Sequence, residues 1–101
     1  MQSELFEWDD WKAERNLRVH GIDFQEARTI FEDPFAITIP DDLHSVEELS
    51  SITLGLSLLS RVLLVVHTER KERIRVISAR RATPTERRQY ESERKAATDD
   101  E

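Results

Sequence analysis

Charged side chains that could act on a phosphate gather in one stretch of this sequence, residues 61–88. The stretch holds nine basic and three acidic residues, a net charge of +6, in a chain whose total is −6. Residues 1–60 carry four basic and thirteen acidic residues, a net of −9, and residues 89–101 a net of −3. Because charge is screened within about 8–10 Å at cellular salt, a basic block can bind an anion locally even in an acidic protein.

Cleavage of RNA without a metal is a reaction that these side-chain types could support. A base must take the proton of the 2′-hydroxyl, an acid must protonate the leaving oxygen, and cations must stabilise the charge that develops on the phosphate. His67 or Glu69 could be the base or the acid, and arginines bind phosphate through paired hydrogen bonds. Ordinary surface ion pairs show the same pattern, so both interpretations stay open. The expected cluster, near one end of a β-hairpin, consists of His67, Glu69, Arg70, Arg73, Arg75 and Arg80.

Other kinds of site find little support in the sequence. The absence of cysteine excludes disulfides and thiolate metal sites. His20, His44 and His67 lack the spacing of zinc motifs, and the two glycines form no phosphate-binding loop. We therefore expect neither a metal nor a cofactor.

Further ligand contacts could come from the N-terminal half. Lys12 and His20 lie eight residues apart, about two turns of one helix, and face either a ligand or solvent. Trp8 and Trp11 could stack on bases, although tryptophans beside a short strand and an amphipathic helix are more often core residues. The residues expected to bind RNA without a catalytic role are Lys12, His20, Arg61, Arg73, Arg81 and Tyr90.

Two helices are expected in the first third of the chain. The first begins at residue 9 or 10, where an aspartate can cap it, and ends at Gly21. Asp23 and Glu26 have the spacing of a capping box for the second, which Pro34 ends. The apolar side of the first helix is expected to comprise Trp11, Leu17 and Ala13.

The middle of the chain has the pattern of an antiparallel sheet, because the links between its apolar runs are short. An alternative is one buried helix over residues 52–66, although Gly55 and the β-branched valines favour strands. Residues 41–48 are expected to form an acidic loop. The expected strands are Leu5–Trp8, Phe35–Ile39, Leu49–Ser57, Arg61–Thr68 and Arg73–Ser78.

A last helix is expected from Thr83 to about Ala97. Thr83 is placed to cap it, Pro84 suits its first position, and Glu86 completes a capping box. This helix is almost entirely polar and is expected to contact the sheet through Tyr90 alone.

The length suits a single domain, expected over residues 1–97, with residues 98–101 as a disordered acidic tail. The first ten residues are acidic and lack the apolar segment of a signal peptide. Residues 52–66, the most apolar stretch, are too few to span a bilayer. We expect a cytoplasmic protein with no membrane contact.

Several motifs in consistent order resemble the BrnT family of toxins, over about residues 6–90. The N-terminal motifs are Phe6-Glu-Trp-Asp9, Lys12-Ala13, Asn16-Leu17, His20-Gly-Ile22, Phe24 with Glu26-Ala27, and Phe31-Glu-Asp-Pro34. The C-terminal motifs are Val65-Val-His-Thr-Glu-Arg70 and Ile74-Arg-Val-Ile-Ser-Ala-Arg80, with Ala82, Glu86 and Tyr90.

The resemblance implies an α+β fold of the RelE type, in which two N-terminal helices and a C-terminal helix pack on an antiparallel sheet. It implies a type II toxin that cleaves RNA without a metal and so inhibits translation and growth. It also implies a BrnA-like antitoxin that binds the toxin in a hetero-oligomer. The family's catalytic residues correspond to Arg70, Arg75 and Arg80, with Glu69 and His67 as further candidates.

The chain departs from the family pattern at two places. Serines stand at Ser50 and Ser51, where relatives usually have an arginine, and Ser60 stands where they often have glycine. These departures favour an alternative, a non-catalytic or weakened member that acts as a protein-binding module for its antitoxin.

Overall fold

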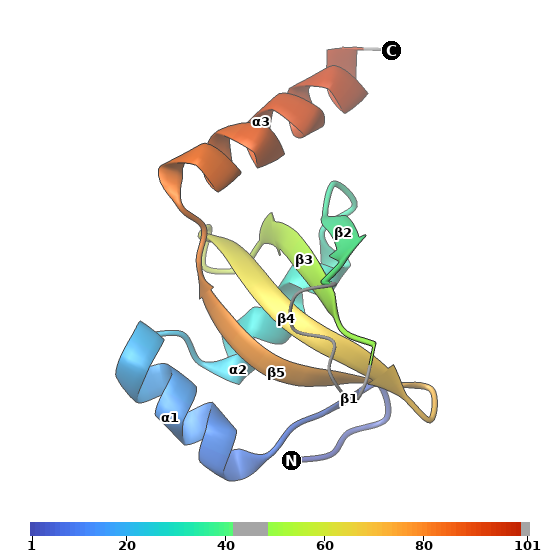
Figure 1. The fold of residues 1–101 in the computed structure, drawn as a ribbon. Helices are drawn as coiled ribbons and strands as arrows, with labels where there is room; N and C mark the ends of the chain where they lie inside the picture. Colours follow the sequence, from blue (N-terminus) through green and yellow to red (C-terminus); the bar gives the residue numbers. More distant parts are fainter. Residues whose placement is uncertain (42–48, 100–101) are drawn as a thin grey trace.

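The computed structural model describes residues 1–41 and 49–99. Residues 42–48 of the expected acidic loop and residues 100–101 of the expected tail lie outside the described residues. The elements, shown in Figure 1, are β1 (Phe6–Glu7), α1 (Asp10–His20), α2 (Phe24–Ala27), the 3-10 helix η1 (Arg28–Glu32), β2 (Ile37–Pro40), β3 (Ser51–Leu56), β4 (Val62–Arg70), β5 (Arg73–Arg81) and α3 (Pro84–Asp99).

The strands form one sheet in the order β1-β5-β4-β3-β2. β2 to β5 pair antiparallel, so the alternative of a single helix over residues 52–66 is wrong. β1 pairs parallel with β5, Phe6 opposite Ile74, so the sheet is mixed and the expectation of a wholly antiparallel sheet is wrong. The prediction relied on short links between neighbouring strands. No short link joins β1 to β5, so link length does not determine the direction of β1 relative to β5. The expected α+β class is confirmed.

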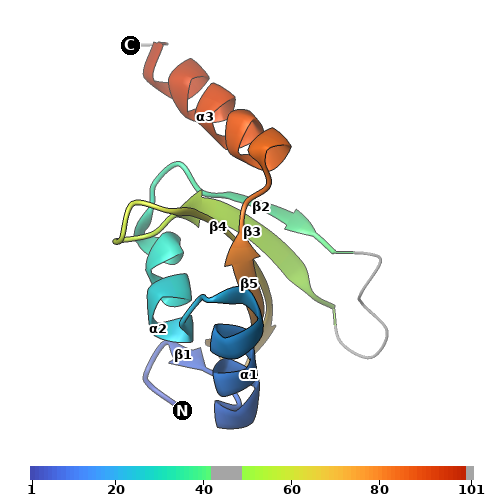
Figure 2. The same ribbon diagram turned by 90° about the vertical axis from the view of Figure 1, so that its left-hand side faces the viewer.

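Two cores lie on opposite faces of the sheet. The larger lies under α1, α2 and η1, which occupy one side of the sheet (Figure 2). The smaller lies on the other face, where α3 meets the sheet and then projects from its end (Figure 1). The larger core contains Trp8, Ile22, Phe24, Ala27, Ile30, Leu63, Val65, Val76 and Ala79, and the smaller contains Leu54, Leu64 and Tyr90.

Helix α1 packs on β5 through a polar side chain. Asn16 is 5% exposed, and its Nδ2 donates to the carbonyls of Ala79 (2.8 Å) and Ile22 (2.9 Å). Its Oδ1 accepts from the Ala79 N–H at 3.0 Å. The expected apolar side is wrong at Trp11 and Leu17, which are 64% and 50% exposed. Hydrogen bonds from Asn16 take the place of an apolar stripe.

The residues predicted to begin and end α1 are confirmed. The Asp9 carboxylate accepts from the Lys12 N–H at 3.0 Å and caps the first turn. Gly21 ends the helix with a φ of 71°, a left-handed conformation that glycine adopts without a Cβ clash.

Helix α3 is held mainly by Tyr90, which is 1% exposed. The Tyr90 hydroxyl donates to Asp33, whose carboxylate also accepts from the Leu56 N–H at 2.8 Å. A second contact, the Arg94 guanidinium over the Phe35 ring at 5.1 Å, shows that Tyr90 does not act alone. The helix extends to Asp99, beyond its expected end at Ala97.

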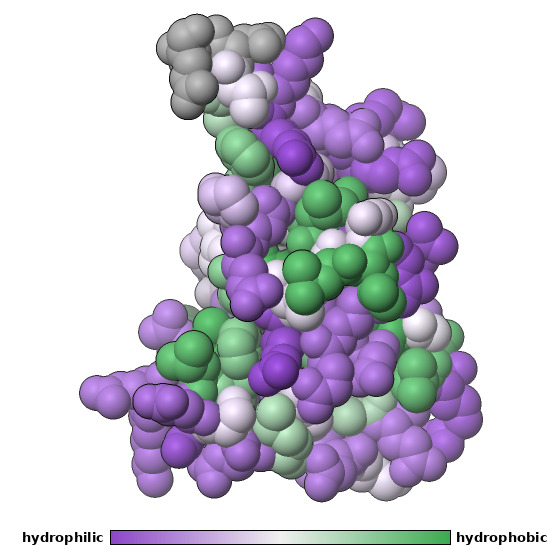
Figure 3. Space-filling view, turned by 180° about the vertical axis from the view of Figure 1, so that it is seen from behind, coloured by the Kyte–Doolittle hydropathy of each residue, from purple (hydrophilic) through white to green (hydrophobic). Residues whose placement is uncertain are grey.

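The surface of the helix side is partly apolar. Figure 3 shows hydrophobic side chains gathered in the middle of the face seen from behind. Leu58 and Leu59, in the turn between β3 and β4, are 73% and 65% exposed. Together with Leu17 they line a hollow of about 430 Å³. Within the described residues, no helix combines the length and the apolar character needed to cross a membrane.

We expect Asn16→Ala to lower the free energy of unfolding by about 2–4 kcal/mol, because each buried polar group left without a partner costs roughly 1–3 kcal/mol. Urea unfolding measures this loss. The matched control is Arg18→Ala, an exposed position on the same helix, which we expect to change the free energy by less than about 0.5 kcal/mol. Equal losses for the two variants would contradict the role given to Asn16.

Tyr90 is the one tyrosine of the chain, so phenolate absorbance reports its titration alone. Burial, and then the hydrogen bond to Asp33, raise the pKa of Tyr90 from 10.0 to about 12. We therefore expect a midpoint near 12 in the native protein and near 10 in denaturant. The contribution to stability is complete below pH 10 and is lost as the pH rises towards 12. A native midpoint at 10 would show that Tyr90 is not buried.

Candidate functional site

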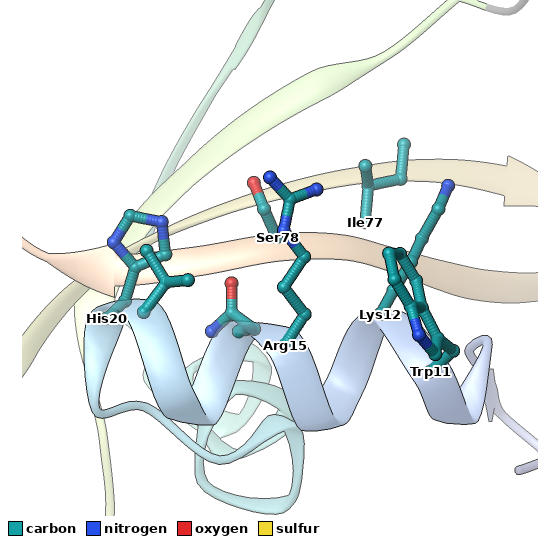
Figure 4. A pocket seen from close by; sticks show the side chains of 8 residues that line it. Trp11, Lys12, Arg15, His20, Ile77 and Ser78 are labelled. Carbon is teal, nitrogen blue, oxygen red and sulfur yellow. The ribbon is translucent and has the colours of Figure 1, made fainter.

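Two hollows share three lining residues beside β5, and we refer to the two together as the groove. The first, about 310 Å³, lies between α1 and β5 (Figure 4). The second, about 430 Å³, continues onto the open face of the sheet. Both are lined by His20, Ile77 and Ser78, which therefore lie where the two hollows join.

A β-bulge shapes the groove at this junction. Val66 pairs with Ser78 but the next residue, His67, pairs with Val76, which leaves Ile77 as an extra residue in β5. A bulge redirects side chains and increases the local twist of the strand. The two residues that line both hollows from β5 are thus the extra residue and its neighbour.

The first hollow is basic. Lys12, Arg15 and His20 line it from successive turns of α1, and its lining includes no carboxylate. Figure 4 shows the Arg15 side chain extending from the helix towards Ser78 on β5. Trp11 stands beside it, with the Arg15 guanidinium 5.9 Å from the ring centroid.

The second hollow holds an arginine in a fixed orientation. Arg80 donates two hydrogen bonds to the Glu86 carboxylate, at 2.8 and 3.0 Å. Its guanidinium, with the Thr83 N–H, lowers the pKa of Glu86 to about 2, so this carboxylate is ionised at neutral pH. The floor of the hollow is apolar and includes Ile52, Leu64 and Val66.

The structure divides the expected cluster of six residues. Arg70 pairs with Arg73 at the hairpin end, whereas Arg80 pairs with Leu64 near the other end of β5. With a rise of about 3.3 Å per residue, Arg75 and Arg80 are roughly 16 Å apart along the strand. The expectation of a single cluster at one end is therefore wrong, because both arginines belong to one long strand.

At the hairpin end the side chains are either paired within the fold or exposed. Arg75 forms an ion pair with Glu7 of β1 at 3.1 Å. The Nε of Arg73 donates to the carbonyl of Ser3 at 2.7 Å. Glu69 and Arg70 are exposed.

His67 lies in the helix-side core rather than in the groove. It is 6% exposed, its Nε2 is 2.7 Å from the Thr53 hydroxyl, and its ring meets Phe31 edge-on. Its Nδ1 is buried and has no hydrogen-bond partner among the described residues. Burial lowers the pKa of His67 and so disfavours the imidazolium form.

Besides Arg73, three more of the expected RNA contacts lie away from the groove. Arg61 donates to Glu26, with 2.9 Å between Arg61 Nε and the carboxylate, and this bond is the main reason why the pKa of Glu26 is lowered. Arg81 is exposed but does not line either hollow. Tyr90 is buried. Of the expected contacts, the groove brings together Lys12 and His20.

Sequence reasoning missed Arg15 and Ser78 as groove residues. Arg15 follows Lys12 by three residues, which places both on one face of a helix, and this spacing could have identified it. Ser78 depends on the bulge, for which the sequence carries no local signal. Among residues 1–41 and 49–99, no group of three or more His, Asp or Glu side chains is placed to hold a metal.

Comparison with known proteins identifies the family. No curated protein matches the sequence. The fold is similar to the crystal structure of the Brucella abortus ribonuclease toxin BrnT, with a TM-score of 0.61 and 22% sequence identity. The match covers 78% of this chain and 97% of that one, and at this identity it shows the fold alone. The family described as "Ribonuclease toxin, BrnT, of type II toxin-antitoxin system" matches residues 8–86, and the chain therefore belongs to the BrnT family.

Proposed function

We propose that this chain is a metal-independent endoribonuclease, the toxin of a type II pair, which cleaves RNA in the groove and so inhibits translation and growth in the cytoplasm. Family membership supports the toxin assignment. Helices α1 and α2 on one face of a mainly antiparallel sheet, with α3 against the other, support a fold of the RelE type. The groove between α1 and β5 is the observation that carries the proposal.

In the proposed site, cations and an imidazole line the path of the RNA. Lys12 and Arg15 line its first part and Arg80 its second, so a bound RNA strand meets cations on both sides of the junction. Cations stabilise the negative charge that grows on the phosphate in the transition state. Because His20 lines both hollows, it lies between these cations.

We assign proton transfer to His20. It is exposed on the last turn of α1, and imidazole is a side chain that can both give and take a proton near neutral pH. His67 is the poorer candidate because it is buried under Phe31 and faces the opposite side of the sheet from the second hollow. A buried imidazole cannot reach the 2′-hydroxyl of RNA in the groove.

The hairpin end is the rival location for the reaction. Glu69 and Arg70 are exposed there, and Arg75 is held by Glu7. In our proposal these residues contact only RNA that extends beyond the groove. The two locations are far enough apart for single substitutions to distinguish them.

We expect Arg80→Ala to reduce the rate of RNA cleavage roughly 100- to 1000-fold, because one preorganised charge contact to the transition state is typically worth that factor. Arg70→Ala, a matched arginine at the hairpin end of the same strand pair, should change the rate by less than about threefold if its charge is merely exposed. Cleavage of a labelled RNA by purified protein, in the presence of a chelator, measures both rates.

His20→Ala should also abolish cleavage, and all three variants must keep the wild-type unfolding curve. Loss of activity in Arg70→Ala with full activity in Arg80→Ala would move the site to the hairpin end. An intact RNA substrate with folded wild-type protein would contradict the proposed reaction.

A second candidate function is a protein-binding module for a BrnA-like antitoxin. The observation that favours it is the hollow lined by Leu17, Leu58 and Leu59, which shares no lining residue with the groove. The turn that presents the leucines is bound to the helix side, because Ser57 donates to the buried Glu26 at 2.7 Å. Exposed leucines in a fixed arrangement suit an apolar protein partner.

We expect the double change Leu58→Ser with Leu59→Ser to weaken antitoxin binding at least about tenfold, since buried interface anchors are commonly worth more than 1 kcal/mol each. RNA cleavage should be unchanged. The matched control is Leu49→Ser, at a leucine that is 87% exposed elsewhere. Isothermal titration with the purified antitoxin measures affinity, and unchanged binding by the double variant would place the partner on another surface.

A further inference from the structure

The first hollow contains an aromatic side chain that the proposed reaction does not use. Trp11 is 64% exposed, whereas Trp8, three residues earlier, is 6% exposed and belongs to the core. The expectation that both tryptophans are core residues is thus confirmed for Trp8 and wrong for Trp11. Single exposed hydrophobic residues are common, so exposure alone assigns no role to Trp11.

The charge around Trp11 gives the second observation. Lys12 and Arg15 line the hollow with it, and Arg15 lies over its ring. Three other surface hollows in the described part of the chain each include carboxylates, such as Glu32, Asp23 or Glu86. In a protein with a net charge of −6, the aromatic ring therefore lies in a hollow with cations and no lining anion.

An aromatic face beside cations suits a particular ligand. An unpaired nucleotide offers a flat base that stacks on aromatic rings and a phosphate that binds cations. The bases of a duplex are already stacked on one another, so their faces are not available to a protein side chain. A protein ligand would bind the two cations favourably only if it carried a carboxylate opposite them.

We propose that this hollow is a subsite for one unpaired nucleotide, with its base stacked on Trp11 and its phosphate held by Lys12 and Arg15, so that the substrate is single-stranded RNA. This inference rests on the proposed function, because it takes the groove as the path of the RNA. The subsite lies at the Trp11 end of the hollow, and His20 lies about 12 Å further along α1 from Lys12. The RNA that follows the subsite therefore leads along α1 towards the junction of the two hollows.

The test measures binding separately from cleavage. The probe is a fluorescein-labelled, fully 2′-O-methylated hexauridylate, which has no 2′-hydroxyl and cannot be cut by the proposed reaction. Fluorescence polarisation should give a dissociation constant that Trp11→Ala raises roughly 5- to 150-fold, the usual range for one base–aromatic contact. Trp11→Phe retains an aromatic face and should restore most of the affinity.

Two matched comparisons control for indirect effects. Leu17→Ala, at an exposed residue of α1 outside this hollow, should leave the affinity unchanged. Lys12→Ala should reduce the slope of log Kd against log salt by about 0.7, the value for one phosphate contact to a single strand. Pairing the probe with its complement should weaken binding and remove the effect of Trp11→Ala.

Each outcome bears on the inference. Equal affinity of wild type and Trp11→Ala, or equal binding of the duplex, overturns it whether or not the protein cleaves RNA. A change of tryptophan emission with the antitoxin but not with the probe assigns the hollow to a protein and also overturns it. Weaker probe binding by Trp11→Ala, in a protein that leaves RNA intact, supports the subsite and contradicts the proposed cleavage alone.

Discussion

The side-chain amide of Asn16 is the interaction on which the groove depends. It joins α1 to the N–H and carbonyl of Ala79 in β5, and to the carbonyl of Ile22 after the helix. Hydrogen bonds rather than an apolar stripe hold α1 on the sheet, so Trp11 and Leu17 are not buried in the core. Trp11 lines the basic hollow, and Leu17 lines the leucine hollow of the helix side. One buried polar residue thus leaves α1 with two surfaces of different chemistry.

Because of ion pairs within the fold, the cations that remain unpaired differ from those suggested by the net charge of each sequence segment. The basic segment has a net charge of +6, yet three of its arginines pair with carboxylates from other elements. Lys12 and Arg15 come from the half with a net charge of −9, and within the described part of the chain they form no ion pair. The unpaired cations of the first hollow therefore come from the acidic half, because pairing depends on contacts far apart in sequence. The pairs that join an arginine of the basic segment to another element are Arg61–Glu26, Arg75–Glu7 and Arg80–Glu86.

Structural features that depend on neighbouring residues were predictable from the sequence, whereas those that depend on contacts between distant residues were not. Gly21 and the capping box of α3 needed only neighbouring residues, and both are confirmed. Glu26 was expected to close a capping box, but its carboxylate turns inward, because a partner from β4 is available only in the folded chain. His67 follows Val65 by two residues and so shares its face of β4, yet its burial depends on the packing of η1. The separation of Arg80 from the hairpin end depends on the length of β5, which continues beyond the expected end at Ser78 to Arg81.

The arginine proposed to act in the groove is positioned from the C-terminal helix. Glu86 accepts from the Thr83 N–H at 2.8 Å, as part of the helix cap, and binds Arg80 with both carboxylate oxygens. An arginine has five N–H donors, so a phosphate can bind the remaining ones without displacing the carboxylate. The ion pair with Glu86 attenuates the charge of Arg80 but fixes the orientation of its guanidinium. Hydrogen-bond donors that are already oriented need not move as charge develops on the phosphate. Because Tyr90 holds α3 on the sheet, the buried hydroxyl and the site cation are linked through one helix. The proposed site therefore requires α3 to be in place, although most of the surface of this helix faces solvent.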